Sequence, residues 1–207
     1  MFGEELEMFW RRKAKKWQTY VEPLKDASLH LGNRSTDRLH FLNVDEATLQ
    51  EVKRAGEYVL PHVTEMLDIF YRNVLKDEYL HDLIKQHSTI DRLKGTLRRY
   101  LEQFFQGEIN EQYIKTREKV GEVHSKINLS ANYFLMGYST ILDSIHAILV
   151  EKLSNHPDEM LRLILAVNKL AAFDQQLIIA TYNEDTFKGF LHEISSVIND
   201  MTEIDLT

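Results

Sequence analysis

The chain has 207 residues and an apolar fraction of 43%, which is sufficient for a hydrophobic core in one domain with an appendage or in two small domains. It contains no cysteine, which excludes a disulfide framework, a thiolate nucleophile and any Cys-based metal or iron–sulfur site, and which fits a reducing cytoplasm. A net charge of −7 gives no general attraction to nucleic acid. No uninterrupted apolar run approaches the roughly 20 residues that span a bilayer, and the N-terminus has no apolar signal core, so we expect a cytoplasmic protein with no membrane partner.

The fold class predicted from the sequence is all-α. Glycine and proline are scarce, helix-period apolar stripes cover nearly everything after Val44, and no segment alternates with period two. Residues 1–44 are interpreted as an N-terminal extension. Within it, residues 4–20 place four aromatic side chains beside five positive charges, a pattern typical of a basic amphipathic helix. Such a helix lies on a membrane or partner, or packs its aromatics on the main domain, and we favour packing; residues 28–43 are predicted to be a loop.

The body of the chain is predicted to begin at Asp45, which reads as the N-cap of a short helix ending near Lys53, with a turn at Gly56. A long amphipathic helix then runs to Val74, with Tyr71 at the edge of its apolar face. Ser88 is predicted to cap the next helix, whose apolar face includes Leu93 and whose end is marked by Gly107; Thr96 lies on or beside that face. We interpret His87 as a terminus or loop residue.

A histidine stands out in the segment YIKTREKVGEVHSKINL at residues 113–129. His124 shares one helical face with Val120, Val123 and Ile127, whereas Arg117 and the other charged residues are placed on the opposite face. An imidazole inside an apolar stripe needs partners for its ring nitrogens. It is either a core histidine bonded to a carbonyl or hydroxyl, or the single axial ligand of a haem.

The last part of the chain is apolar over long stretches. Residues 130–153 form a helix with a wide apolar face, and the helix at 158–183 is apolar almost all round. A helix of that kind is buried on every side, so we expect a homodimer that joins these two antiparallel helices of each subunit in a four-helix bundle. A heptad pattern over residues 186–204 predicts a parallel coiled coil leaving the dimer.

These segments together resemble the sensory globin domain of globin-coupled sensors, of the heme aerotaxis transducer and globin-coupled diguanylate cyclase type. The matching segments are DIFYRNVL at 68–75, HSTIDRLKGTLRRYLEQFFQGEI at 87–109, IKTREKVGEVHSKINL at 114–129 and YFLMGYSTIL at 133–142. The resemblance implies a globin-like helical sandwich at residues 45–185, an N-terminal helical extension at 1–44, and a C-terminal coiled-coil helix at 186–207 that links to an output domain.

The same resemblance implies a haem b (iron protoporphyrin IX) whose iron is bound by His124 as the proximal ligand. It implies a distal, ligand-binding side formed by Tyr71, Thr96 and Leu93. The remaining pocket residues that it implies are Phe70, Leu97, Tyr100, Val120, Val123, Ile127, Tyr133 and Phe134. The expected ligand is dioxygen, and carbon monoxide and nitric oxide are expected to bind as well. One hydroxyl donor to bound dioxygen is worth about 0.5–1.5 kcal/mol, which tunes affinity about threefold to tenfold.

Several alternatives stay open at this point. The proximal aromatic is Tyr133 or Phe134, and one residue of register decides which. Ligation is expected to move the His124 helix, repack the helix at 130–153 and change the angle of the tail. Residues 202–207 resemble the entry to a diguanylate cyclase domain, although a methyl-accepting signalling domain would also use a helical tail. The related stressosome regulators offer a haem-free interaction module instead, and no catalytic motif is found within the 207 residues.

Overall fold

The computed structural model describes residues 33–204, with side chains described for residues 35–182. The amphipathic segment at 4–20, the heptad side chains after Tyr182 and the last three residues lie outside the described part. The described chain is helical throughout and contains no strand, which confirms the all-α fold class. The elements in chain order are α2 (Asn33–Phe41), α3 (Glu46–Val59), η1 (Leu60–His62), α4 (Val63–Val74), α5 (Glu78–His87), α6 (Ile90–Phe104), α7 (Glu111–Lys126), α8 (Ala131–Leu153) and α9 (Pro157–Ile204).

Of the two N-caps predicted from the sequence, that of α3 is confirmed and that of α6 is wrong by one residue. Asp45 caps α3 by accepting a hydrogen bond from the Thr48 amide, as predicted. Asn110 and Ser130 cap α7 and α8 in the same way. For α6 the cap is Thr89 rather than Ser88, because the Thr89 hydroxyl accepts the Arg92 amide while Ser88 ends the preceding helix.

Two predictions about the N-terminal half were wrong. Helix α3 continues past Lys53 to Val59, and Gly56 lies inside it, where the helix passes close to Phe105: a Cβ on Gly56 would lie 2.7 Å from the Phe105 Cβ. The turn instead occurs at η1, which contains Pro61. Residues 33–41 form helix α2 rather than a loop, and the fully buried side chain of Leu39 joins the main core.

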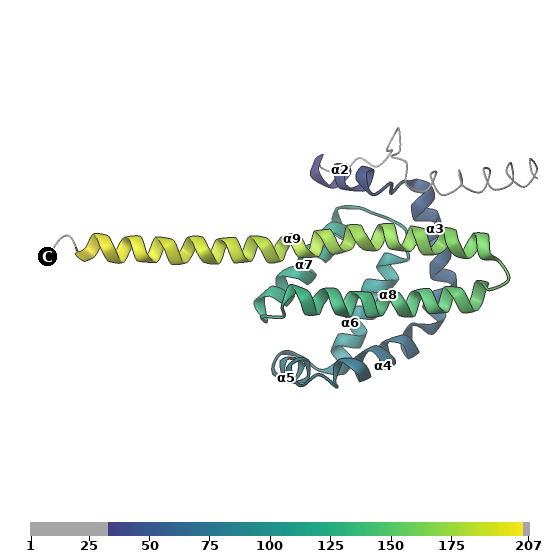
Figure 1. Ribbon diagram of the computed structural model, residues 1–207, viewed down its shortest axis with the longest axis horizontal. Coiled ribbons are helices and arrows are strands. Elements are labelled where there is room, and N and C mark those ends of the chain that lie inside the picture. Colours follow the sequence, from purple (N-terminus) through teal and green to yellow (C-terminus); the bar gives the residue numbers. More distant parts are fainter. Residues whose placement is uncertain (1–32, 205–207) are drawn as a thin grey trace, which may run out of the picture.

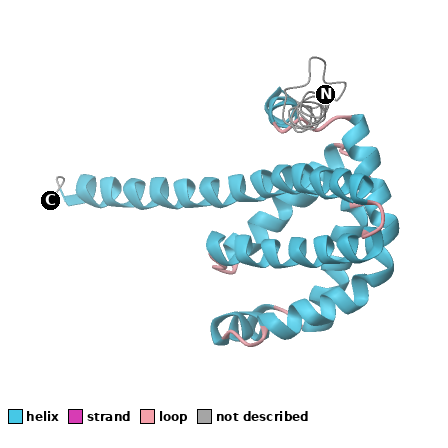
Figure 2. Ribbon diagram, turned by 45° about the vertical axis from the view of Figure 1, so that its right-hand side comes forward, coloured by secondary structure: helices cyan, strands magenta, loops and turns pink. Residues whose placement is uncertain are grey.

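Helix α9 is the longest element and lies along the whole domain (Figure 1). Its first half contributes Leu163, Val167, Leu170 and Phe173 to the core, all fully buried. Val52, Ala55 and Val59 of α3 pack into the same core. Beyond the core, α9 continues as one uninterrupted helix to Ile204 and extends away from the other helices (Figure 2). The helical tail predicted for residues 186–204 is therefore present.

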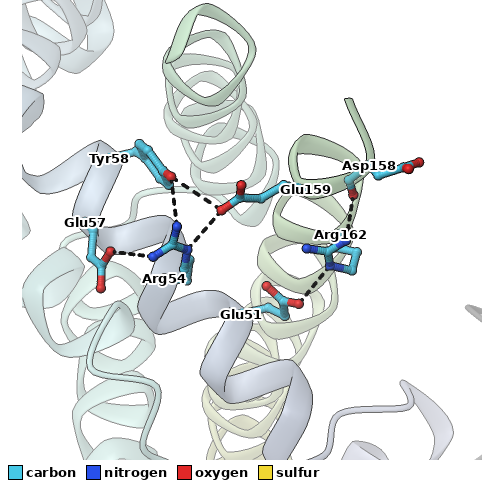
Figure 3. Close-up of polar contacts among 7 residues, drawn as sticks. All are labelled: Glu51, Arg54, Glu57, Tyr58, Asp158, Glu159 and Arg162. Atoms are coloured by element: carbon cyan, nitrogen blue, oxygen red, sulfur yellow. Dashed lines mark hydrogen bonds and ion pairs between the residues drawn. The ribbon is translucent and has the colours of Figure 1, made fainter. Parts of the chain in front are cut away.

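Polar contacts fix α3 against the first turns of α9 at the surface. The Arg54 Nε lies 2.9 Å from a carboxylate oxygen of Glu159, and the Arg162 Nε lies 3.0 Å from one of Glu51 (Figure 3). The Tyr58 hydroxyl shares the Glu159 carboxylate with Arg54. Because these groups face solvent, the pairs define register more than they add stability.

Two stretches, Ala131–Leu153 and Pro157–Tyr182, are long and apolar enough to cross a membrane by length and composition alone. No membrane span is predicted from uninterrupted apolar runs in the sequence. The core helix of a globular domain has the same length and apolar composition, so these two helices are weak support for a membrane span. Half of the apolar stretch in α9 is buried within the domain, whereas only 22% of the apolar stretch in α8 is buried. Helix α8 therefore leaves much apolar surface uncovered.

Candidate functional site

His124 lies in the last turn of α7, with its ring largely withdrawn from solvent. Its Nδ1 is buried and has no hydrogen-bond partner among the described residues. Desolvation lowers the pKa of His124 from 6.5 to about 4, so the imidazole is neutral at pH 7. A neutral imidazole is the form that binds a metal. The Nε2 of His146 in α8 is likewise buried without a partner among the described residues, so His124 is distinguished by its surroundings rather than by the unbonded nitrogen alone.

An apolar and aromatic cluster lies beside this ring, because its member Phe134 contacts the ring of His124. Its buried members are Phe134 of α8 and Ile178 and Tyr182 of α9, and the partly buried Val120, Leu129, Tyr100 and Tyr138 pack against them. The ring centroids of His124 and Phe134 are 5.6 Å apart. Of the two aromatic residues predicted from the sequence, Phe134 is therefore the one in contact with His124. Tyr133 is directed elsewhere: its ring lies 5.0 Å from that of Tyr79, and its hydroxyl lies 3.5 Å from a carboxylate oxygen of Asp77.

Tyr71, predicted to be a distal residue, lies in α4 and is 93% withdrawn from solvent. Its ring makes an edge contact with Phe70, at 5.0 Å between centroids, and no hydrogen bond joins its hydroxyl to any side chain or carbonyl of the described residues. Burial raises the pKa of Tyr71, which keeps the phenol protonated. The hydroxyl is thus a donor that no described residue uses. Phe70 in turn packs near Gly137 of α8, where a Cβ would lie 3.7 Å from the ring.

The other predicted pocket residues differ in how deeply they are buried. Leu93, Leu97, Val120 and Ile127 are partly buried, and Val123 is 44% exposed beside His124. Thr96 is exposed; its hydroxyl donates to the Arg92 carbonyl at 3.0 Å and accepts from Arg99. Those bonds are typical of a threonine on a helix surface. A pocket role for Thr96 stays a prediction.

Sequence reasoning missed a buried polar cluster next to this site. Arg117 was placed on the polar face of its helix, but its side chain and that of Asp174 on α9 are both fully buried. The Arg117 Nε lies 3.1 Å from the Asp174 Oδ2, and the hydroxyls of Tyr113 and Tyr100 donate to the two carboxylate oxygens at 2.5 and 2.6 Å. The Arg117 guanidinium also stacks on the Tyr113 ring and donates to Gln103.

Opposing effects act on the titration of this cluster. Burial raises the pKa of the Asp174 carboxyl, and Arg117 and the two tyrosine hydroxyls oppose that rise. Asp174 is the sole carboxylate between Glu159 and Glu184 in a mostly apolar part of the helix, and that isolation was the signal in the sequence that could have revealed a buried ion pair. The cluster ties Tyr100, a predicted pocket residue on α6, to α7 and α9.

The residues around His124 fit a haem. A flat apolar cofactor needs a neutral imidazole, apolar and aromatic walls, and no competing carboxylate at the ligating ring. The His124 ring meets these conditions, with its one fully buried nitrogen unbonded and Phe134 as a wall. Within the described residues no group of three or more His, Cys, Asp or Glu side chains could hold a bare metal ion.

The protoglobin family model matches residues 32–188 of the chain. The chain belongs to the protoglobin family. This protoglobin domain is similar to the heme-based aerotactic transducer HemAT of Halobacterium salinarum, with 28% identity over 167 residues, or 75% of the chain. The match spans 34% of the transducer's own length. The family match begins at residue 32 and therefore includes α2.

Comparison with solved structures agrees on the fold. The globin domain of a Geobacter sulfurreducens globin-coupled sensor superposes with a TM-score of 0.66 at 18% identity, over 70% of this protoglobin chain and 95% of that domain. At this level of identity the likeness shows the fold alone. The globin-like fold class and the resemblance to globin-coupled sensors, both predicted from the sequence, are confirmed.

Proposed function

We propose that this protoglobin domain is a haem-based gas sensor, with dioxygen as its main ligand and His124 as the residue that holds the iron of a haem b. The observation that carries the proposal is the buried, neutral and unbonded imidazole of His124 against Phe134. The similarity to a transducer named as heme-based supports it. A bound haem would supply reversible binding of a diatomic gas, His124 would supply the nitrogen that holds the iron, and Phe134 would supply an apolar wall.

Selectivity among gases is assigned to the distal side. The Tyr71 hydroxyl is a protonated donor with no competing bond to a described residue, and Leu93 contributes apolar bulk; Thr96 would join them as a second donor. Bound dioxygen carries partial negative charge, so a donor in a dry pocket stabilises it more than it stabilises carbon monoxide. Nitric oxide is expected to bind without needing this hydrogen bond.

A homodimer through α8 and α9 is part of the same proposal. Met136 and Val150 of α8 are 63% and 47% exposed, and Leu135 and Leu161 are exposed as well. A second copy that packs its own α8 and α9 against these side chains would bury an apolar surface that the single chain leaves open. The four-helix bundle formed in this way would place the two α9 helices side by side.

The output of the sensor is assigned to a domain after residue 207. Helix α9 runs from the core to Ile204 without a break, which suits a rigid connection to a following domain. A diguanylate cyclase or a methyl-accepting signalling domain would fit such a helical connection, and a cytoplasmic location suits both. The sensor domain itself is proposed to have no catalytic activity.

The deciding experiment is the absorption spectrum of the purified, reduced chain with and without carbon monoxide. We expect a Soret band that shifts when carbon monoxide is added, and we expect His124→Ala to lose or alter that band. His146→Ala is the matched control, because the Nε2 of His146 in α8 is also buried without a partner among the described residues, whereas His146 makes no ring contact with Phe134; this variant should leave the spectrum unchanged. A colourless chain that also refuses added haem would contradict the sensor proposal and leave a haem-free interaction module of the stressosome type.

A further inference from the structure

Helix α7 is bound to α9 along a continuous line of contacts, which we call the α7–α9 seam. It consists of Tyr113, Arg117 and Gly121 on α7 and Asp174, Ile178 and Thr181 on α9. The α7 residues recur every four positions and the α9 residues at four and three, so each set occupies one helical face. Within the described chain, these two helices pack on each other more extensively than any other pair.

At Gly121 the two helix backbones are in direct contact. A Cβ at this position would overlap the carbonyl oxygen of Ile178 and the hydroxyl of Thr181. That hydroxyl is itself held by a 2.7 Å hydrogen bond to the same carbonyl. Only glycine permits such an approach, and His124 follows three residues later on the same helix. His124 therefore lies about one helical turn from this contact, and any movement of His124 starts close to it.

At the other end of the seam, the buried ion pair prevents α7 from sliding past α9. Moving Arg117 away from Asp174 would leave two unpaired charges in the protein interior, which is strongly unfavourable. The Tyr113 hydroxyl adds a second bond between the same two helices. The face of α7 that contacts α9 is thus fixed both sterically and electrostatically.

We propose that the α7–α9 seam makes the two helices one rigid unit, so that movement of His124 reaches the C-terminal helix directly. This inference rests on the proposed haem function for its physiological meaning. It differs from the route expected from the sequence, in which the helix at 130–153 relays the movement. In the direct route α8 supplies Phe134 as a wall of the pocket and does not transmit the signal, whereas Gly121 and the Arg117–Asp174 pair are the coupling points.

The test compares amide hydrogen exchange of α9 in the reduced, haem-loaded chain with and without carbon monoxide. In the parent we expect carbon monoxide to change the amide exchange rates of residues 170–204 by about threefold or more, because a shift in a local opening equilibrium changes the exchange rate in proportion. Gly121→Ala should still bind haem and carbon monoxide but lose most of that change. Gly95→Ala is the matched control, because a Cβ there meets only the end of the Arg99 side chain at 3.7 Å.

A response of α9 in Gly121→Ala equal to that of the parent would overturn the proposal. Since Gly121→Ala risks misfolding, Thr181→Ala provides a second variant that loosens the same contact by removing atoms. It should fold and show a partial loss of the carbon monoxide response. If Gly121→Ala does not fold and Thr181→Ala keeps the full carbon monoxide response of α9, the proposal is overturned.

Hydrogen exchange of the haem-free chain distinguishes an error in the proposed rigid α7–α9 unit from an error in the proposed haem function. In the chain without haem, amides of residues 113–126 and 170–182 should exchange through one shared opening, with the same dependence on urea. Thr181→Ala should accelerate both segments by a similar factor and leave α4 unchanged. Independent opening of α7 and α9 would overturn the seam whatever the spectra show. A colourless parent with coupled opening would refute the haem proposal and keep the seam.

Discussion

The ring of His124 lies against that of Phe134, with the centroids 5.6 Å apart and the planes inclined at 45°. Phe134 contacts Tyr182 of α9 in turn, at 6.2 Å between centroids. The side chain beside the candidate ligand thus has no hydroxyl, so it cannot form the proximal hydrogen bond that a tyrosine at this place would offer. The neighbouring Tyr133 instead points toward α5.

This arrangement predicts that substitutions at two adjacent aromatic residues differ in their effect on stability and haem retention. Phe134→Ala should destabilise the haem-free chain by about 3–5 kcal/mol, because it empties a packed site, and should speed haem loss from the loaded chain. Tyr133→Phe should leave stability and haem retention unchanged. Urea denaturation followed by circular dichroism, and haem transfer to excess apomyoglobin, measure the two effects. Equal effects of both substitutions would show that the assignment of the proximal aromatic is wrong.

The desolvated imidazole predicts a pH dependence of folding stability. The pKa of His124 is about 4 in the folded chain and near 6.5 when exposed, so only the unfolded chain binds a proton between these values. Stability of the haem-free chain should fall as the pH drops from 6.5 to 4, by up to about 3 kcal/mol from this residue, and should level off below pH 4. Above pH 6.5 the imidazole is neutral in both the folded and the unfolded chain, so this residue adds no pH dependence to the free energy of unfolding.

Other groups titrate in the same pH range, so the contribution of His124 is obtained by comparing the parent with a variant that lacks the imidazole. His124→Phe keeps an aromatic ring but cannot be protonated, and its free energy of unfolding should depend less steeply on pH between 6.5 and 4. Urea titrations at a series of pH values measure both proteins. Parallel curves for the parent and His124→Phe would show that the imidazole is not desolvated.

The buried ion pair predicts strong non-additivity. Asp174→Leu and Arg117→Met each leave one buried charge without its partner, and each should cost about 3–5 kcal/mol. The double variant should cost much less than the sum, because neither charge then remains. A double-mutant cycle from urea denaturation gives the coupling directly. Additive losses would mean that the two charges do not stabilise each other in the folded chain.

The unused hydroxyl of Tyr71 predicts a change in function without a change in folding. Tyr71→Phe removes no hydrogen bond to a described residue, so stability should stay within about 0.5 kcal/mol of the parent. Dioxygen affinity should fall about threefold to tenfold, mostly through faster dissociation, while carbon monoxide affinity changes less. Flash photolysis and stopped-flow mixing measure these rates. An unchanged dioxygen dissociation rate would place the tyrosine outside the ligand site.

The open apolar face of α8 predicts a concentration-dependent dimer. Met136→Lys together with Val150→Lys should give monomers, since each introduces a charge into the proposed interface. Light scattering after size exclusion measures the mass. Phe41→Lys serves as the control, because Phe41 is 84% exposed and lies at the end of α2. A monomeric parent, or a dimer that survives both lysines, would argue against this interface.

The sequence alone determined the features that depend on neighbours in the chain. The caps at Asp45, Asn110 and Ser130 depend on bonds to amides three residues on, and the helical class depends on periodicity and scarce glycine and proline. The placement of His124 on a helix with apolar neighbours, and the family, followed from the same kind of local pattern. These features need no knowledge of which helix packs on which.

Only the tertiary structure decided which faces meet. Arg117 is buried because Asp174 lies opposite it, 57 positions along the chain, and no local pattern states that pairing. Gly56 and Gly121 both lie inside helices, where their missing Cβ atoms admit Phe105 and α9 respectively, although a glycine in sequence reads equally well as a turn. The choice of Phe134 over Tyr133 likewise rests on the rotation of α8 about its axis. The burial of apolar side chains between helices that are distant in the sequence sets that rotation.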